Sequence, residues 1–390
     1  MRNHIIFTSG GLSSFAVADF VKQHFPMDNI LLYFTDTLWE NADLYRFIKE
    51  ASDKLELPLL THADGRTPIQ VMFDEKFIFN SRVGNCSKRL KMEVSDRFIR
   101  KGIKPKFEKW RNRQYLKNEN FLDNPILYFG IGFNEMHRQD AIAFNWQPYQ
   151  VEFPLIDHII DNDEILAKYS IRRPELYDLS FSHNNCNGRC VKGGQAHFAN
   201  LYDKMPDVYN ELKIQEFHLK NAVDSYHYLM RLKKEVQEND PWDLAGFIEM
   251  ELEQLDKAYR PYFYGEVEKP GMYLHPSVSA SADQWEFRTY AFMKKTKNKV
   301  TKPLMLKEFE SSARAMLRKK EEIKRKNGVQ VNLFELSEQT DVDVLDHGGC
   351  GCFFDYEDVP SDNKPALACK LSESVVPVEE LLDGQLCVLL

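Results

Sequence analysis

The chain contains 390 residues, of which 43% are hydrophobic and 13% aromatic, and it carries a formal net charge of −8 at pH 7. A chain of this length can bury one large hydrophobic core or two moderate ones. The negative charge argues against a uniformly basic nucleic-acid-binding protein, and no apolar run approaches the length that spans a membrane. Because Arg2 leads directly into the first predicted strand, we expect no signal segment and a cytoplasmic enzyme without a membrane partner.

The first predicted strand, at residues 4–8, is followed by Ser9-Gly10-Gly11-Leu12-Ser13-Ser14 and then by a helical pattern. Apolar residues at helical spacing from Phe15 to Phe25 indicate the helix. The two glycines let the backbone approach an anion closely, serine hydroxyls add donors, and the helix N-terminus presents free N–H groups. We interpret residues 9–14 as a phosphate-binding loop; the alternative is an ordinary strand-to-helix turn.

Strands and helices continue to alternate after this loop. A wholly apolar run at residues 30–34 predicts a buried parallel strand that ends in Thr35-Asp36-Thr37, so Asp36 lies where open α/β sheets bind ligands. The later predicted elements are a helix at residues 40–55, a strand at residues 57–61 and a strand at residues 126–132. Pro58 places the second of these at a sheet edge. This alternation predicts an α/β domain with a doubly wound, mostly parallel, Rossmann-like sheet.

Beyond residue 200 the pattern is mainly helical. Helical patterning covers residues 206–259 with a break at Asp240-Pro241-Trp242, and Lys269-Pro270-Gly271-Met272 predicts a turn. We therefore divide the chain into an α/β domain at residues 1–200, a mainly helical region with a basic segment at residues 201–340, and a last segment at residues 341–390. The last segment holds a cysteine-containing loop, which we expect to return to the site, and an acidic tail.

Two stretches are rich in Lys and Arg. They are residues 97–117, which interleave Trp110 and Tyr115 with basic residues, and residues 288–326. Such stretches suit the phosphate backbone of RNA or DNA, with the rings available to stack on unpaired bases. The alternative is a solvated helix face, above all at residues 314–326, or a basic patch that the acidic tail neutralises. RNA or DNA is therefore one candidate partner.

The ordered motifs of the first 215 residues or so resemble a known family. Ser9-Gly10-Gly11-Leu12-Ser13-Ser14 is similar to the SGGxxS loop of the PP-loop ATP pyrophosphatases, the adenine nucleotide alpha hydrolase superfamily. Cys86-Ser87-Lys88-Arg89-Leu90-Lys91 and Gly130-Ile131-Gly132-Phe133-Asn134-Glu135-Met136-His137-Arg138 look like its phosphoadenosine phosphosulfate reductase-like group. Three further blocks continue the same order: Phe153-Pro154-Leu155-Ile156-Asp157, Arg173-Pro174-Glu175-Leu176-Tyr177 and Asn185-Cys186-Asn187-Gly188-Arg189-Cys190.

The resemblance implies an adenine nucleotide, ATP or a relative, over the carboxyl edge of the sheet. Family members cleave the bond between the α- and β-phosphates, so that a substrate is adenylylated and then attacked by sulfur or nitrogen. Positive charge and Mg²⁺ are the usual means of catalysis. The implied nucleotide-binding residues are Ser9, Gly10, Gly11, Ser13, Ser14 and Asp36, the last of which contacts the nucleotide or its Mg²⁺. The implied cations are Lys88 and Arg138, with Arg89 and Lys91 as further candidates.

The seven cysteines give a second signal. In a reducing compartment, clustered cysteines more often hold a metal or carry out chemistry than form disulfides. Cys186 and Cys190 form one spaced pair and Cys350 and Cys352 another, so together they predict a four-cysteine site for Zn²⁺ or an iron–sulfur cluster. His183 or His347 could replace one ligand. Inert burial is the expectation for Cys369 and Cys387.

Cys86 is the best candidate for a reactive thiol. In the related adenylyl sulfate reductases, cluster cysteines occur both in the block around Cys86 and in a later pair near Cys186 and Cys190. That family has two adjacent cysteines in the first block, whereas here Cys86 is followed by Ser87. Two arrangements remain open. One is a three-cysteine cluster with one open iron; the other is a catalytic Cys86 beside a separate four-cysteine site.

Three functions compete at this stage. The first is an ATP pyrophosphatase that adenylylates a substrate for sulfur transfer or for nucleotide or nucleic-acid modification, served by a sulfur-donor protein. The second is a sulfonucleotide reductase, although Gly349-Cys350-Gly351-Cys352 lacks the acid and the histidine of the reductases' catalytic motif. The third is a nucleotide-sensing component of a multi-protein defence or modification system.

Overall fold

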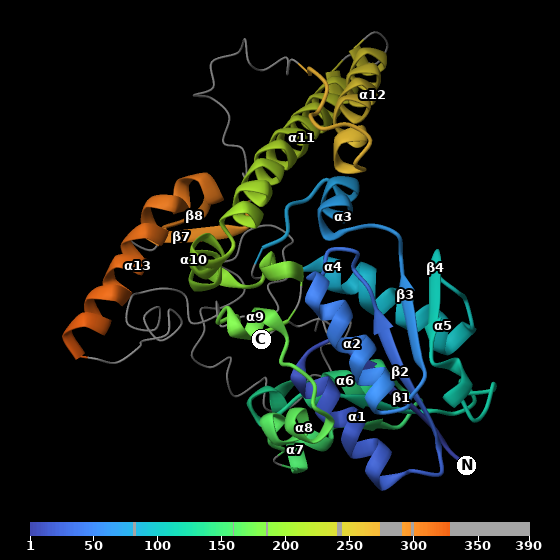
Figure 1. The fold of residues 1–390 in the computed structure, drawn as a ribbon. Coiled ribbons are helices and arrows are strands. Elements are labelled where there is room, and N and C mark those ends of the chain that lie inside the picture. Colours follow the sequence, from blue (N-terminus) through green and yellow to red (C-terminus); the bar gives the residue numbers. More distant parts are fainter. Residues whose placement is uncertain are drawn as a thin grey trace. The chain divides into compact units, whose positions relative to one another are not determined.

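The structure, a computed structural model, describes residues 1–80, 83–158, 160–184, 186–239, 244–273, 291–297 and 300–327 (Figure 1). These residues fall into two compact units. Unit 1 contains Met1–Arg66 and Ser87–Cys190, and unit 2 contains Thr67–Cys86 and the described residues from Val191 onward. The described chain changes unit after Arg66, Cys86 and Cys190, whereas the sequence predicted one boundary near residue 200. The predicted last segment, residues 341–390, lies outside the described residues.

Unit 1 is built on a six-stranded sheet with the strand order β4-β3-β2-β1-β5-β6. The strands are β1 (Asn3–Thr8), β2 (Asn29–Thr35), β3 (Leu59–Ala63), β4 (Phe107–Arg111), β5 (Ile126–Phe129) and β6 (Val151–Glu152). Every neighbouring pair is parallel except β3 and β4, which are antiparallel. The predicted α/β class with a mostly parallel sheet is confirmed.

Helices cover both faces of this sheet, which explains why its central strands are apolar throughout rather than alternating. Ile6 of β1 belongs to one buried cluster, together with α1 (Leu12–His24), α2 (Ala42–Lys54) and α8 (Asn162–Tyr169). Its neighbours Ile5 and Phe7 belong to a second cluster, together with α5 (Glu93–Lys101) and α6 (Gln139–Asn145). Because successive side chains of a strand point to opposite faces, the sheet is doubly wound.

Short helical segments connect these elements of unit 1. They are α4 (Asn85–Ser87), which spans the unit boundary, η1 (Lys88–Met92), η2 (Arg113–Tyr115), η3 (Phe133–Arg138), α7 (Pro154–Asp157), α9 (Glu175–Asp178) and η4 (Cys186–Gly188). The segment η1 is π-helical, a form that appears mostly as single turns inside α-helices and is frequent at functional sites. Several of these segments follow the carboxyl ends of the strands.

The position predicted for the third strand was wrong. β3 is not an edge strand, because β4 pairs with it along its whole length. Pro58 precedes the strand, so its missing N–H removes nothing from the ladder, while its carbonyl accepts a hydrogen bond from the Leu32 N–H at 2.9 Å.

Unit 2 is mainly helical, as expected for the C-terminal region. Its helices are α3 (Pro68–Glu75), α10 (Gly194–Lys204), α11 (Pro206–Asn239), α12 (Leu244–Phe263) and α13 (Leu306–Asn327), and its hairpin consists of β7 (Met293–Lys297) and β8 (Val300–Leu304). The start of α3 is fixed by a capping box between Thr67 and Gln70, with Pro68 in the first turn. No helix among the described residues is long and apolar enough to cross a membrane.

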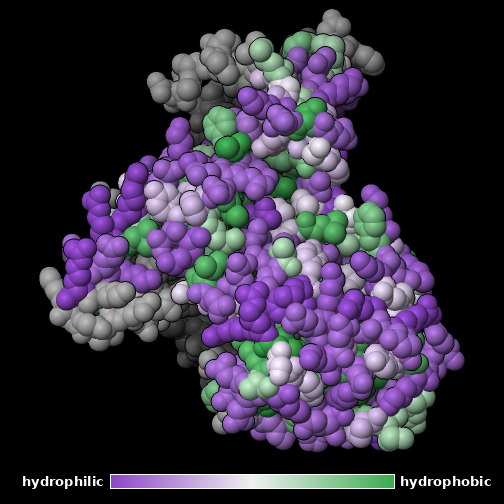
Figure 2. All heavy atoms as spheres, in the orientation of Figure 1, coloured by the Kyte–Doolittle hydropathy of each residue, from purple (hydrophilic) through white to green (hydrophobic). Residues whose placement is uncertain are grey.

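Most of the visible face in Figure 2 is hydrophilic, with apolar residues scattered over it. Three exposed apolar side chains belong to loops that follow strands of unit 1: Leu38 after β2, and Phe133 and Met136 after β5. Their exposed fractions are 41%, 71% and 41%. Single exposed apolar residues need no explanation, but three in loops at the carboxyl edge of one sheet agree with a ligand-facing rim.

Candidate functional site

The strand order places a topological switch point between β1 and β5. From β1 the chain proceeds outward through β2 and β3, then returns to the other side of β1 to form β5 and β6. The loops that leave β1 and β5 therefore diverge, and such a topological switch point is where open α/β sheets bind ligands. The loop after β1 is the predicted phosphate loop, and Gly130 and Gly132 follow β5.

Two glycines let the backbone at this switch point pack closely against neighbouring residues. Gly10 adopts a φ of 76°, in the left-handed region, and a Cβ there would lie 2.6 Å from Cγ of Leu44. At Gly130 a Cβ would lie 2.9 Å from the backbone nitrogen of Ser14. The end of β5 thus lies directly against the first turn of α1, and a larger residue at position 130 would push that turn away.

The serines of the loop have different roles. Ser14 is buried; its hydroxyl donates to the Gly11 carbonyl at 2.9 Å and accepts the Ser9 N–H at 3.2 Å. It is therefore part of the scaffold that shapes the loop. Ser9 is half-buried and its Oγ accepts the Gly11 N–H at 3.4 Å, whereas Ser13 is exposed. Of the predicted phosphate ligands, Ser13 and Ser9 keep hydroxyls at or near the surface.

The N-terminus of α1 has the electrostatics of an anion site. Its N-cap residue, Gly11, contributes no side-chain hydrogen bond, and the first turn contains no acidic residue. By contrast, α2 is capped by Asn41 and has Asp43 in its first turn. The positive end of the α1 dipole is thus not offset by a carboxylate of its own helix, which favours a bound anion.

Asp36 follows β2, as predicted. Its Oδ1 accepts hydrogen bonds from the Leu38 N–H and from the Tyr45 hydroxyl, both at 2.8 Å. Burial raises the pKa of Asp36, although these two bonds oppose the shift. A nearby cation would stabilise the ionised form of this buried carboxyl group. Asp36 therefore fits a role as one carboxylate ligand of a Mg²⁺ ion that a nucleotide carries.

A buried charged cluster lies beside Asp36. Glu40, whose side chain is 1% exposed, lies 3.9 Å from Nζ of Lys91, whose side chain is 4% exposed. Glu40 also accepts a hydrogen bond from the Thr37 hydroxyl at 2.8 Å and another from the Cys186 N–H. The sequence analysis named Lys91 as a candidate cation for phosphate but missed Glu40, because only the fold brings together residues 146 positions apart in the chain.

The two cations predicted for catalysis both lie in unit 1. Lys88 is half-buried in η1, and Arg138 is 9% exposed at the end of η3. The Arg138 guanidinium donates to the Glu135 carboxylate. Part of its positive charge is therefore already neutralised.

The cysteine pair of unit 1 is brought together. Cys190 is hydrogen-bonded to the Cys186 thiol, and this bond, burial and the nearby Glu40 raise the pKa of Cys186. The chain between them is strained, because Cys186 and Asn187 have φ values of 48° and 49°. His183 is half-buried three residues earlier.

The rest of the predicted metal site is not described. Cys350, Cys352 and His347, like Cys369 and Cys387, lie outside the described residues. Within the described ranges, no group of three or more His, Cys, Asp and Glu side chains could hold a metal ion. Two thiols alone do not make a four-ligand site, so the described residues do not by themselves fit zinc or an iron–sulfur cluster.

Cys86 belongs to unit 2, not to the unit that holds the loop and the cysteine pair. It is half-buried, and its Sγ lies 3.7 Å from the Gly84 carbonyl oxygen. None of Cys86, Cys186 and Cys190 forms a disulfide, so all three are free thiols. The choice between ligand and nucleophile for Cys86 stays open.

The basic stretch at residues 97–117 is largely engaged in ion pairs. Arg111 donates to Asp53, Arg113 to Glu119 and Lys104 to Glu108. Trp110 packs edge-on against Phe121 at a ring distance of 5.7 Å and is covered by the Arg113 guanidinium. This arrangement leaves the ring little free face for a base.

The second basic stretch, at residues 288–326, is only partly described. Its C-terminal part forms α13, which exposes Arg314, Arg318 and Lys319 together with Glu321 and Glu322. Mixed charge on an exposed helix is typical of a solvated face.

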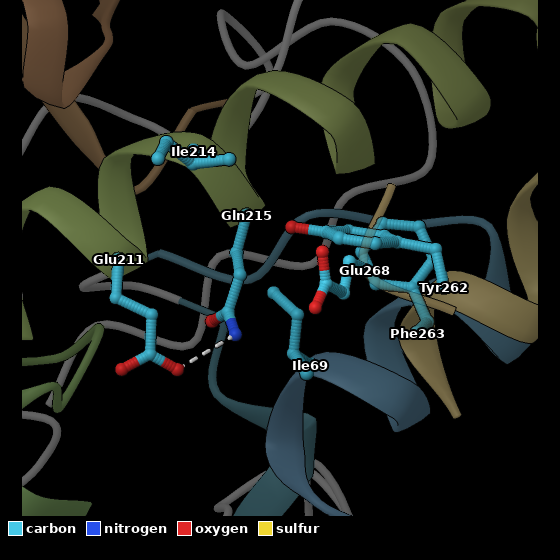
Figure 3. A pocket seen from close by; sticks show the side chains of 7 residues that line it. All are labelled: Ile69, Glu211, Ile214, Gln215, Tyr262, Phe263 and Glu268. Atoms are coloured by element: carbon cyan, nitrogen blue, oxygen red, sulfur yellow. Dashed lines mark hydrogen bonds between the residues drawn. The ribbon is translucent and has the colours of Figure 1, made fainter. Parts of the chain in front are cut away.

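Unit 2 contains a pocket of about 310 Å³ (Figure 3). Its lining residues are Ile69, Glu211, Ile214, Gln215, Tyr262, Phe263 and Glu268. Figure 3 shows the Gln215 amide turned towards the Glu211 carboxylate, to which it donates at 3.2 Å. Two carboxylates and an apolar wall disfavour a phosphate group, so this pocket does not compete with the α1 loop for a nucleotide.

No model of a known protein family matches the sequence, and no curated protein matches it. The family resemblance therefore rests on the motifs of the chain. What the fold itself defines is a mostly parallel α/β unit with glycines in the loops at its switch point, and a second, mainly helical unit.

Proposed function

We propose that the chain is an ATP-binding enzyme of the PP-loop type that cleaves the α–β phosphate bond of ATP and adenylylates a substrate. The observation that supports this most strongly is the N-terminus of α1, which has no acidic residue in its first turn and follows a glycine loop at the switch point of the sheet. The adenine nucleotide alpha hydrolase fold of unit 1 is part of the same proposal. In this proposal the modified substrate is a nucleic acid or a nucleotide, and the modification is sulfur transfer.

The residues of the loop would divide the binding of phosphate between them. Backbone N–H groups at the start of α1 and the hydroxyls of Ser9 and Ser13 would contact phosphoryl oxygens, and Gly10 and Gly11 would let the anion come close. Ser14 would hold the loop in shape through its bond to the Gly11 carbonyl. The nucleotide would supply Mg²⁺ with phosphate ligands, and Asp36 would add one carboxylate.

The reaction needs positioning and charge more than covalent help from the protein. A nucleophilic atom of the substrate attacks the α-phosphorus, the bond from that phosphorus to the bridging oxygen breaks, and pyrophosphate leaves with the electron pair. Sulfur or nitrogen then displaces AMP from the adenylylated substrate. Lys88 and Arg138 would stabilise the charge that grows on the leaving pyrophosphate, and Cys86 stays the candidate reactive thiol, with no step assigned to it.

Zinc or an iron–sulfur cluster on Cys186, Cys190, Cys350 and Cys352 remains part of the proposal, with no step assigned to it. The described pair would supply two thiolates, whose formation the raised pKa of Cys186 opposes until a cation binds. Metal and acid-labile sulfide analysis of protein purified without oxygen would distinguish a zinc site from a cluster.

The products of ATP test the proposal. We expect the full-length protein, given ATP labelled in the α-phosphate together with RNA or DNA and sulfide as the sulfur donor, to release labelled AMP and pyrophosphate. Labelled ADP with inorganic phosphate, or no turnover despite tight binding of ATP, would contradict it. Thioredoxin-dependent release of sulfite from phosphoadenosine phosphosulfate would instead identify the reductase.

A further inference from the structure

The hydroxyl of Tyr177 lies at the N-terminus of α1. The backbone N–H of Leu12 donates to this hydroxyl oxygen at 3.4 Å, although the two residues are 165 positions apart. The Asn184 N–H donates to the same oxygen. A Cβ at Gly11 would lie 3.0 Å from it. Tyr177 therefore borders the phosphate loop directly.

This hydroxyl has a proton to give. Both of its recorded hydrogen bonds use the oxygen as the acceptor, so the O–H bond remains available as a donor. Burial raises the pKa of Tyr177, so the group stays protonated at neutral pH. A protonated hydroxyl beside helix N–H groups is complementary to an anion and not to a cation.

The segment that carries Tyr177 is fixed independently of the loop. The Glu175 N–H and the Arg172 guanidinium both donate to the Asp43 carboxylate of α2, at 2.8 and 2.6 Å. The Arg173 guanidinium lies over the Tyr177 ring, 5.5 Å from its centroid, and places a positive charge beside this side chain. The position of the hydroxyl is thus set before any ligand arrives.

A second buried group at the loop has unused hydrogen-bonding capacity. Asn184 is 3% exposed, and its Nδ2 donates to the Gly10 carbonyl at 2.7 Å. Its Oδ1 is buried and has no hydrogen-bond partner among the described residues. Because a buried acceptor without a donor is costly, a water or a ligand hydroxyl at the loop would satisfy it.

We propose that Tyr177 is a positioning residue for the nucleotide, donating its hydroxyl proton to a phosphoryl oxygen that is bound at the α1 N-terminus. The inference rests on the proposed function, because it takes the di- or triphosphate of an adenine nucleotide as the ligand. Tyr177 thus supplies a side-chain donor beside the glycine loop, and Asp43 of α2 holds the segment that carries it. Asn184 then fixes the Gly10 carbonyl and with it the shape of the loop.

The test compares Tyr177→Phe with the wild type in the full-length protein, using calorimetry with ATP, inorganic pyrophosphate and adenosine as separate probes. Removing one hydrogen bond to a charged group should weaken binding of ATP and of pyrophosphate about tenfold and leave adenosine unchanged. Tyr169→Phe is the matched control, because its hydroxyl donates to Asp19, outside the loop. This control should bind all three probes as the wild type does.

The outcomes separate the two proposals. If the wild type binds neither ATP nor pyrophosphate, the proposed function fails and the role of Tyr177 fails with it. If the wild type binds both and Tyr177→Phe binds them equally well, or loses adenosine to the same extent, only the role of Tyr177 is overturned.

Gly11→Ala provides a second test, because it leaves Tyr177 in the chain and displaces only its hydroxyl. Its methyl group would displace the hydroxyl, so it should weaken pyrophosphate binding by a smaller factor than Tyr177→Phe. In the double variant Gly11→Ala should add no further loss. A full additional loss would show that Gly11 acts without Tyr177, against the inference.

Discussion

Among the described residues each unit buries one glutamate, and the two are held in different ways. In unit 1, Glu40 lies beside the Lys91 ammonium and accepts from Thr37. In unit 2, Glu216 is 0% exposed and accepts two backbone bonds, from the Phe292 N–H at 3.0 Å and the Leu306 N–H at 2.7 Å. These two N–H groups lie on either side of the β7–β8 hairpin, so Glu216 ties both ends of the hairpin to α11.

The difference shows why burial of an acid does not by itself mark a site. Glu216 is a structural clamp, and burial raises its pKa to about 7 despite its two backbone bonds. Glu40 is part of a charged cluster in the loops at the carboxyl ends of strands, next to Asp36 and the cysteine pair. Position relative to the sheet, and a partner of opposite charge, distinguish the candidate site from the clamp.

The largest effect should come from removing the cation beside Glu40. Lys91→Met keeps the size of the side chain but leaves a buried carboxylate without its partner, so we expect a loss of about 3–5 kcal/mol of unfolding free energy. Urea denaturation measures it. The double variant with Glu40→Gln should recover much of the loss. If Lys91→Met alone is neutral, the two groups do not form a coupled pair.

The clamp should show itself in the pH dependence of stability. The ordinary pKa of a glutamate is 4.5, and that of Glu216 is about 7, so between these values the folded state binds an extra proton. The contribution of Glu216 to the free energy of unfolding is therefore fully present below pH 4.5. It falls by about 3 kcal/mol as the pH rises past 7. Glu216→Gln should abolish this part of the slope in denaturation curves at several pH values. An unchanged slope would rule out Glu216 as its source.

Stability and ATP binding should depend on side-chain size at Gly130 but not at Gly132. Gly130→Ala would press on the backbone of the first turn of α1, so we expect a loss of about 1–3 kcal/mol together with weaker ATP binding. Gly132→Ala is the control, because a Cβ there would meet nothing within 4 Å. Thermal denaturation with and without ATP compares the two. Equal effects would show that the contact between β5 and α1 does not shape the loop.

The smallest effect concerns backbone strain beside Asp36. Leu38 has a φ of 56°, unfavourable for a leucine, and is 41% exposed, so Leu38→Gly removes strain and little packing. After the extra entropy of glycine in the unfolded chain, we expect a gain of about 0.5 kcal/mol. Lys76 in unit 2 has a similar φ of 54°, but it contacts Phe73 and Asp256, so Lys76→Gly should destabilise the protein. A loss of stability in Leu38→Gly would reveal packing that its exposure does not indicate.

The sequence predicted the elements whose signal is local. β1, β2, β5 and the helix after the phosphate loop were found because long apolar runs and helical periodicity mark them. β4 was missed because Phe107–Arg111 carries alternating charges and is a strand only through its pairing with β3. β6, with two residues, has no pattern to detect.

The candidate site divides in the same way. The sequence identified the loop and Asp36, since both follow strands directly. It did not reveal that Glu40 supports Cys186 or that Tyr177 reaches Leu12, because these contacts join residues 146 and 165 positions apart. Tyr177 ends the motif Arg173-Pro174-Glu175-Leu176-Tyr177, and its place in this motif is the only sequence signal for its role.

Hydrogen exchange in the full-length protein, with and without ATP and Mg²⁺, tests the central claim most directly. We predict slower exchange on ATP binding for backbone amides of residues 9–14 and 130–132, with the residues around Tyr177 also protected. Unchanged exchange in the loop, together with protection of the unit 2 segment that contains Glu211 and Gln215, would contradict the account and move the nucleotide to the other pocket.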